Sequence, residues 1–360
     1  MRGHAADRVT RPRMLLLSMY PLDQGLWGAT TRITQLRDAL SRRVELDVVA
    51  GTRSARGAAL ARYVAAGRLR GLAAIYVENA TTLPGPLDLA FVAVARARRI
   101  PILTYVRDAQ QLFPEYYVAN TLKRRASRAL FLPATRALIR ASTTAAFPSR
   151  GLAAAVLGEG RRAQAAPLLP PGSRLADAGP INPAARSLLF VGGLRYPAHG
   201  GAILLDAMAL AHARSSNLEL ICVSRPGEEL PGPPPAWLRV VRAEGREIDA
   251  LLPEVLATIT PRRKTSYNDL AVPIKVMEYL GYGRPLIVTD TTETAAIVRA
   301  AGCGIVVPDT VEGLAGGIAT IAGAPAEQLV RWGEAARAAA VANSWDARAD
   351  RILELLGVAA

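Results

Sequence analysis

The sequence predicts an α/β protein with two Rossmann-like domains in tandem, facing a central cleft. Short apolar runs typical of buried strands alternate with longer stretches of helical periodicity. This alternation favours parallel sheets that are covered by helices on both faces. The series occurs twice, before and after a proline-rich segment at 166–184. At 360 residues the chain is also too long for one ordinary core.

The first domain is expected to span 1–165. Its basic start is followed by an apolar run at 14–19 that is short for a signal-peptide core and lacks a small-residue cleavage site. A first buried strand is therefore the better interpretation. The expected strands are at 14–18, 44–49, 73–77, 101–105 and 143–147. The expected helices include 30–41, 87–97 and 122–141.

The segment at 166–184 is expected to link the domains, and the second domain is expected to span 185–342. A last helix follows, which Ser344 or Asp346 is suited to cap. In open α/β sheets ligands bind outside the carboxyl ends of the strands, so two such domains face to face would place the active site in the cleft. The expected strands of the second domain are at 187–191, 218–223, 238–241, 257–259, 286–288 and 304–307.

The composition excludes several classes of protein. Apolar content of 51% and charged content of 21% are typical of a soluble globular protein. No apolar run reaches the roughly 18 residues of a membrane span. Cys222 and Cys303 lie in apolar runs and are expected to be buried thiols in a reducing compartment, not a disulfide or a metal pair. Three histidines are too few for a histidine-rich metal site, so no metal is expected.

The net charge of +14 has more than one explanation. An anionic membrane surface would attract such a chain, whereas an arginine-rich genome would produce the charge without any role. Nucleic acid is disfavoured because no RRM, zinc-finger or RGG pattern occurs and aromatic residues make up only 5% of the chain. The arginine-rich stretch at 122–140, expected to be interrupted at Pro133, would lie on an anionic membrane or form a solvated helix face.

The most informative segment runs from Pro273 to Pro285 and continues into an apolar strand. It predicts a helix that begins on a proline and ends at Gly283, which can adopt the left-handed conformation. Lys275 and Glu278 are three residues apart and share one face of this helix. The ammonium and the helix start would attract phosphate, and the carboxylate would accept hydrogen bonds from ribose hydroxyls. The alternative is a solvated ion pair on a surface helix.

This segment resembles the donor-binding signature of the glycosyl transferases group 1 family, whose members are retaining glycosyltransferases of the GT-B fold. The match is at Lys275, Glu278, Gly283 and Pro285. In that family the glutamate at the position of Glu278 holds the ribose of the nucleotide. Many members carry a second glutamate eight residues earlier, facing the donor sugar. That position is Leu270 here, so the resemblance implies that contact with the sugar comes from elsewhere.

The resemblance extends to other parts of the second half. A glycine turn that contains Gly193 and Arg195 is similar to the family's phosphate loop, where backbone N–H groups approach a phosphate. Arg195 is expected to replace the usual arginine of that loop, and the alternative is a solvated loop arginine. Arg246 lies where family members hold the nucleotide base. A last helix at 343–360 is expected to pack back on the first domain, as it does in the family.

In the first domain the resemblance assigns the glycine loop of Gly25, Trp27 and Gly28 to the donor phosphate and the acceptor. The alternative is a plain turn anchored by Trp27. Arg107 and Asp108 follow an expected strand and therefore lie at a carboxyl strand end. Asp108 is similar to the family's acidic residue near the acceptor, and the alternative is a cap on the next helix.

The expected activity is transfer of a sugar from a nucleotide-diphosphate donor to a glycan, lipid-linked or natural-product acceptor, with retention of configuration. The sugar nucleotide is a co-substrate and no cofactor is expected. The expected location is the cytoplasm, with peripheral binding at the inner face of the membrane left open. The alternatives are a catalytically silent nucleotide-sugar-binding scaffold and a nucleotide-sugar 2-epimerase, which would need more acid and base groups than the sequence offers. The predicted catalytic residues are Asp108, Lys275 and Arg195, and the predicted donor-binding residues are Gly193, Arg195, Arg246, Lys275 and Glu278.

Overall fold

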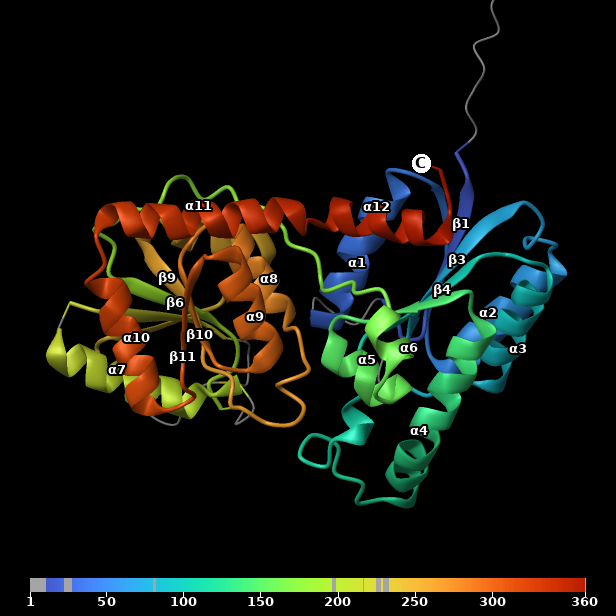
Figure 1. The fold of residues 1–360 in the computed structure, drawn as a ribbon, viewed down its shortest axis with the longest axis horizontal. Coiled ribbons are helices and arrows are strands. Elements are labelled where there is room, and N and C mark those ends of the chain that lie inside the picture. The colour runs from blue at the N-terminus through green and yellow to red at the C-terminus, as the bar shows by residue number, and fades with distance from the viewer. Residues whose placement is uncertain are drawn as a thin grey trace, which may run out of the picture. The chain divides into compact units, whose positions relative to one another are not determined.

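The computed structural model divides the chain into two compact units (Figure 1). Unit 1 comprises Met1–Phe147, Ala153–Leu169 and Arg348–Ala360, and unit 2 comprises Pro148–Leu152 and Pro170–Ala347. The expected loop residues Gly25 and Trp27 lie outside the described residues. The structure describes residues 11–22, 28–79, 82–195, 199–215, 217–224, 228 and 233–359.

Unit 1 contains a parallel sheet of five strands in the order β2-β1-β3-β4-β5. Each expected strand is present, with its ends shifted by at most two residues. The chain order reverses at β1, which pairs with β2 on one side and β3 on the other. Such a reversal is the usual place for a ligand at the carboxyl edge of a sheet. The strands are β1 (Arg13–Ser18), β2 (Glu45–Val49), β3 (Leu72–Asn79), β4 (Ile102–Val106) and β5 (Thr144–Ala146).

Helices cover both faces of this sheet. In Figure 1, α1 and α12 lie on the opposite side of the sheet from α2 and α3. One face buries side chains of β1 and β3 against Leu60 of α2, Phe91 of α3 and Leu138 of α4. The helices of unit 1 are α1 (Gly28–Ser41), α2 (Arg53–Ala65), α3 (Pro86–Ala97), α4 (Leu122–Ala141) and α6 (Arg161–Ala165), with the short 3₁₀ helix η1 (Gln110–Leu112). Unit 1 also contains most of α5 (Arg150–Leu157) and of α12 (Trp345–Leu356), whose first three residues belong to unit 2.

Helix α4 corrects one expectation, because it continues through Pro133 without a break. A proline inside a helix removes one N–H donor, which leaves the carbonyl four residues earlier without its usual partner. Here that residue is Ala129, and both Pro133 and Ala129 are exposed. Water can therefore hydrogen-bond to the carbonyl that the ring leaves free.

Unit 2 contains a parallel sheet of six strands in the order β11-β10-β9-β6-β7-β8. All six expected strands are present within two residues of their expected ends. β6 pairs with β7 on one side and β9 on the other, so the order reverses there. The strands are β6 (Ser187–Val191), β7 (Glu219–Val223), β8 (Leu238–Val241), β9 (Val255–Thr260), β10 (Leu286–Thr289) and β11 (Gly304–Val307).

Two apolar layers hold the helices of unit 2 against its sheet. Leu188 and Phe190 of β6 face the layer of α7 and α10, whereas Leu189 between them faces the layer of α8, α9 and α11. This alternation follows from the two-residue period of a strand. The helices are α7 (Gly201–Arg214), α8 (Ile274–Gly281), α9 (Thr292–Ala301), α10 (Val311–Ala322) and α11 (Ala326–Ala342), with the 3₁₀ helix η3 (Gly245–Glu254).

Three smaller expectations are confirmed. Cys222 and Cys303 are buried free thiols. The Ser344 hydroxyl accepts a hydrogen bond from the Ala347 N–H at 3.2 Å and so caps α12. Gly283, just beyond α8, has a φ of 62°. Within the part of the chain that the structure describes, no helix combines the length and apolar character needed to cross a membrane.

Candidate functional site

The turn after β6 lies at the reversal of strand order in unit 2. Gly192 follows the strand with a φ of 147°, a conformation that favours glycine. Its N–H donates to the Val223 carbonyl at 2.9 Å. The N–H of Val191 donates to the Tyr279 hydroxyl of α8 at 2.7 Å. The turn is therefore fixed by β7 and by α8 together.

Lys275, in the first turn of α8, brings its ammonium to this turn. Lys275 Nζ lies 5.0 Å from the centre of the Phe190 ring, and a Cβ atom built on Gly192 would lie 2.7 Å from it. Burial raises the pKa of the nearby Cys222 thiol to about 12, and the positive charge of Lys275 acts in the opposite direction. The structure thus joins the glycine turn and the lysine, which are 83 residues apart in the sequence (275 − 192).

Glu278 is half-buried one turn further along α8. It lies in the field of Arg174, whose pKa is raised mainly by hydrogen bonds to Asp249, with a smaller contribution from Glu278. Two guanidinium nitrogens of Arg174 donate to the Asp249 carboxylate at 2.5 and 2.8 Å, and one donates to the Gly245 carbonyl at 3.2 Å. Arg174 therefore fixes η3 beside Glu278. Arg174 lies in the expected linker, where no sequence motif marks it as a site residue.

The other predicted donor-binding residues lie in the turn after β6 and at the start of η3. Gly193 is buried directly after Gly192, and Arg195 is exposed two residues further on. Arg246 is exposed in the first turn of η3, next to the Gly245 carbonyl that accepts from Arg174.

Leu270 and Asp269 both make contacts within unit 2. A Cβ atom on Gly151 would overlap with Leu270 Cδ2, so the leucine packs against the start of α5. The Leu270 carbonyl accepts from the Ser149 hydroxyl at 2.5 Å. Asp269 Oδ1 accepts from the Thr292 N–H at 3.0 Å, at the start of α9. Asp269 is therefore engaged with a helix start.

Two threonine hydroxyls near the carboxyl edge of this sheet have no hydrogen-bond partner among the described residues. Thr260 ends β9 and Thr291 precedes α9, and both side chains are buried. Buried polar groups in proteins are usually satisfied, so unsatisfied ones at a ligand-binding edge are candidates for ligand contact. No sequence motif marks these two threonines, because threonine in an apolar run also serves as an ordinary strand residue. Within the described ranges, no three His, Cys, Asp or Glu side chains come together as potential metal ligands.

In unit 1, Arg107 and Asp108 lie at the carboxyl end of β4. The Arg107 N–H donates to the Asn79 carbonyl at the end of β3, at 3.0 Å. The Arg107 guanidinium lies 5.2 Å from the centre of the Tyr20 ring. Asp108 Oδ1 accepts from the Ala109 N–H at 2.7 Å, just before η1. Both predicted residues are therefore at the edge where α/β sheets bind ligands.

A buried ion pair lies behind this edge. Arg32 Nε of α1 donates to Glu78 Oε1 of β3 at 3.0 Å, and both side chains are buried. The same guanidinium donates to the Tyr76 hydroxyl at 3.2 Å and lies 3.9 Å from the centre of the Tyr105 ring. The pair fixes α1, which begins at the predicted loop residue Gly28, against the sheet. No sequence signal pairs two residues that are 46 positions apart.

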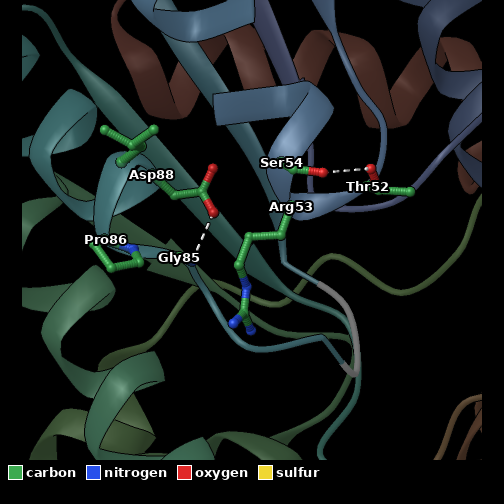
Figure 2. Close-up of a pocket in the computed structure, with 7 residues that line it drawn as sticks. Thr52, Arg53, Ser54, Gly85, Pro86 and Asp88 are labelled. Atoms are coloured by element: carbon green, nitrogen blue, oxygen red, sulfur yellow. Dashed lines mark hydrogen bonds between the residues drawn. The ribbon is translucent and has the colours of Figure 1, made fainter. Parts of the chain in front are cut away.

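Unit 1 also has a pocket of about 480 Å³ between the first turns of α2 and α3 (Figure 2). Asp88 closes one side by accepting from the Gly85 N–H at 2.7 Å and pairing with Arg56 at 2.6 Å. Figure 2 shows the Arg53 side chain extending alongside it. None of the site residues predicted from the sequence lines this pocket. Its lining residues are Thr52, Arg53, Ser54, Gly85, Pro86, Leu87 and Asp88.

Comparisons with known proteins bear on the fold of the chain and on the family similarity of unit 2. Residues 185–324 match the family model described as Glycosyl transferases group 1. Sequence comparison with curated proteins finds no match. Among solved structures, the fold is similar to that of sucrose-phosphate synthase from Thermosynechococcus elongatus, with a TM-score of 0.66 and 14% identity over 96% of this chain and 98% of that one.

Two further structures show the same fold. HepE from Anabaena, in complex with UDP and glucose, matches with a TM-score of 0.64 and 16% identity, over 96% of this chain and 99% of that one. The UDP-forming trehalose-phosphate synthase from Burkholderia xenovorans matches with a TM-score of 0.59 and 12% identity, over 96% and 100%. The chain therefore has the GT-B fold, and its residues 185–324 match the model of the glycosyl transferases group 1 family.

Proposed function

We propose that this protein transfers a sugar from a nucleotide-diphosphate donor to an acceptor hydroxyl, with retention of configuration at the anomeric carbon. The position of the Lys275 ammonium against the Gly192 turn carries the proposal. A fixed positive charge beside a glycine turn at a strand end suits a diphosphate, because backbone approach and charge act on the same group.

The donor is proposed to bind unit 2. Glu278 would accept hydrogen bonds from the ribose, and Gly193, Arg195 and Arg246 would line the phosphate and base positions. One structural neighbour is described in complex with UDP-glucose, and another as UDP-forming with glucose-6-phosphate. A uridine diphosphate sugar is therefore the first donor to test, and a sugar or sugar phosphate the first acceptor.

In the proposed reaction the bond between the anomeric carbon and the leaving phosphate oxygen breaks. A bond to the acceptor oxygen forms on the same face of the sugar, and the acceptor proton passes to the leaving phosphate. Lys275, with Arg195, would stabilise the negative charge that develops on the diphosphate, which is electrostatic catalysis that requires no metal. Asp108 is proposed to orient the acceptor at the carboxyl edge of unit 1.

A second candidate function is a sugar-nucleotide-binding protein without turnover. The packing of Leu270 against Gly151 favours it, because the residue that faces the donor sugar in many family members is absent here. The two free thiols are consistent with the proposed location in the cytoplasm.

The first test measures thermal stabilisation by a panel of nucleotides and nucleotide sugars. We expect one diphosphate sugar to raise the melting temperature selectively, and Glu278→Ala to lose that shift. Glu312→Ala, an exposed acid of α10, is the matched control and should keep it. No shift with any donor would reject the donor site.

The second test measures turnover with the donor that stabilises the protein. Release of the nucleoside diphosphate with an acceptor, together with a product whose anomeric configuration matches the donor by NMR, would support the transferase. Stabilisation without turnover over a broad acceptor panel would support the binding protein instead.

A further inference from the structure

The outer face of α4 has no role in the proposed reaction. The inner face of this helix buries Phe131, Thr135 and Leu138. The opposite face is also apolar, and every residue on it is exposed, including Leu122 at 83% and Leu130 at 55%. In Figure 1, α4 lies at the periphery of unit 1. The outer apolar face, which recurs at helical spacing, consists of Leu122, Ala126, Ala129, Leu130 and Pro133.

Positive charge lies on both sides of this outer apolar face near its start, because helical spacing places Lys123 on one side of it and Arg125 on the other. Arg124 lies 5.1 Å from the centre of the Tyr117 ring, and Arg125 Nε donates to the Ala119 carbonyl at 3.3 Å, so two of the guanidinium groups are held in place. No acidic residue occurs between Glu115 and Glu159. No carboxylate of α4 or of the chain segments on either side of it therefore offsets these charges. The exposed basic residues of α4 are Lys123, Arg124, Arg125, Arg128 and Arg140.

We propose that α4 docks unit 1 on an anionic lipid membrane surface. An exposed apolar stripe with flanking basic residues is the pattern of helices that lie in the membrane interface. Leu122 and Leu130 would enter the boundary between headgroups and acyl chains, and the basic residues would contact lipid phosphates. A purely solvated helix face does not require exposed leucines, and a nucleic-acid backbone would leave them in water. This inference does not depend on the proposed transferase activity.

The test is co-sedimentation of the full chain with lipid vesicles at low and high salt. We expect binding to vesicles that contain phosphatidylglycerol, little binding to phosphatidylcholine alone, and loss of binding at high salt. Each basic residue near an anionic surface is worth about fivefold in partition, so Lys123→Gln with Arg125→Gln should weaken binding roughly 25-fold. The matched control is Arg161→Gln with Arg162→Gln on α6, which should bind as the parent does, because both arginines are exposed outside α4.

The contribution of the outer apolar face to vesicle binding is tested separately. At low salt, where the parent chain is expected to bind, Leu130→Ser should weaken binding, whereas Val341→Ser, which changes an equally exposed residue of α11 (54%), should not. Circular dichroism of each variant verifies that it is folded. The proposal is overturned by equal binding to neutral vesicles, by binding that the α4 variants do not change, or by duplex DNA competing fully with the vesicles.

Discussion

Lys275 Nζ occupies the space that a side chain at Gly192 would need. A Cβ atom on Gly192 would lie 2.7 Å from that nitrogen, and the φ of 147° at Gly192 already disfavours other residues. Gly192 therefore has two roles: it lets the chain turn after β6, and it leaves room for the Lys275 ammonium. The functional consequence is that the two residues should behave as one unit in donor binding.

Gly192→Ala is therefore expected to weaken donor binding as well as stability. Strain at the unusual φ should cost about 1 to 3 kcal/mol. Because the ammonium ends a flexible side chain, it can move away from a new Cβ atom, and this part of the cost should appear in donor affinity. Calorimetric titration with the donor and urea unfolding measure the two parts.

Gly160→Ala is the matched control for this variant. Gly160 has a φ of 125°, and no described atom lies within 4 Å of the position that a Cβ atom would take there, so alanine introduces strain alone. We expect both variants to lose stability and only Gly192→Ala to lose affinity for the donor. Equal donor affinity in the two variants would contradict the pairing of Gly192 with Lys275.

Lys275→Met is expected to lower kcat by about 10²- to 10³-fold, because it removes one fixed charge from the leaving group. Methionine keeps much of the apolar stem of lysine, so the packing against Phe190 should survive. Lys264→Met is the control, since Lys264 forms an exposed pair with Asp290 at 3.4 Å, and such pairs contribute little. Nucleoside diphosphate release under saturating donor measures the effect, and equal rates in both variants would exclude this role for Lys275.

Tyr279→Phe is expected to loosen the turn after β6. The Tyr279 hydroxyl accepts from the Val191 N–H at 2.7 Å, and an N–H left unsatisfied in a buried position costs about 1 to 3 kcal/mol. Tyr282→Phe is the comparison, because its ring centre lies 5.8 Å from that of Tyr279 and the same atom is removed. Unfolding and donor titration should both show the larger loss in Tyr279→Phe, and the reverse order would show that this bond does not hold the turn.

Local patterns in the sequence predicted most of the architecture. The strands follow from apolar periodicity, and the end of α8 follows from a helix-terminating residue, Gly283. Both signals are properties of residues that are close in the sequence. The strand order in each sheet did not follow from them. It depends on which strands pair, and no single segment encodes that.

The candidate site was predicted only in part, for the same reason. Lys275 and Glu278 stand in one motif, whereas the pairing of Arg174 with Asp249 joins residues 75 positions apart. The packing of Leu270 against Gly151 is likewise a tertiary contact. The sequence showed that a glutamate was missing at 270, and only the structure shows what the leucine does there.

Stability is expected to fall at alkaline pH through the buried thiols. Burial raises the pKa of both Cys222 and Cys303 from 9.0 to about 12. The unfolded chain therefore loses these protons first as the pH rises above about 9, and the folded state is disfavoured by about 1.4 kcal/mol per pH unit for each thiol. The stability that the protonated thiols contribute to the folded state is fully present below pH 9.0 and is lost as the pH rises towards about 12.

The double variant Cys222→Ala with Cys303→Ala isolates this effect. Its stability at neutral pH should be lower because two small cavities form, but its decline with pH should be shallower than that of the parent chain. Urea unfolding across the alkaline range measures both slopes. Parallel slopes would show that the thiols titrate alike in the folded and unfolded states.

Arg284 is expected to be the most sensitive basic residue of unit 2. Its side chain is 1% exposed. Its Nε donates to the Leu252 and Val255 carbonyls at 3.3 and 3.1 Å, and its Nη2 to the Leu252 and Ala178 carbonyls at 2.9 and 3.1 Å. Burial lowers the pKa of this guanidinium. One planar group thus ties three separate segments together.

Arg284→Lys should therefore destabilise unit 2 by about 3 kcal/mol or more, although it keeps the charge. A lysine ammonium concentrates its donors at one point and cannot reach carbonyls that surround a planar fork, so several of them would be left buried and unsatisfied. Arg299→Lys, at an exposed position on α9, should change stability by less than about 0.5 kcal/mol. Urea unfolding compares the two, and a similar small effect in both would mean that water replaces the guanidinium at no cost.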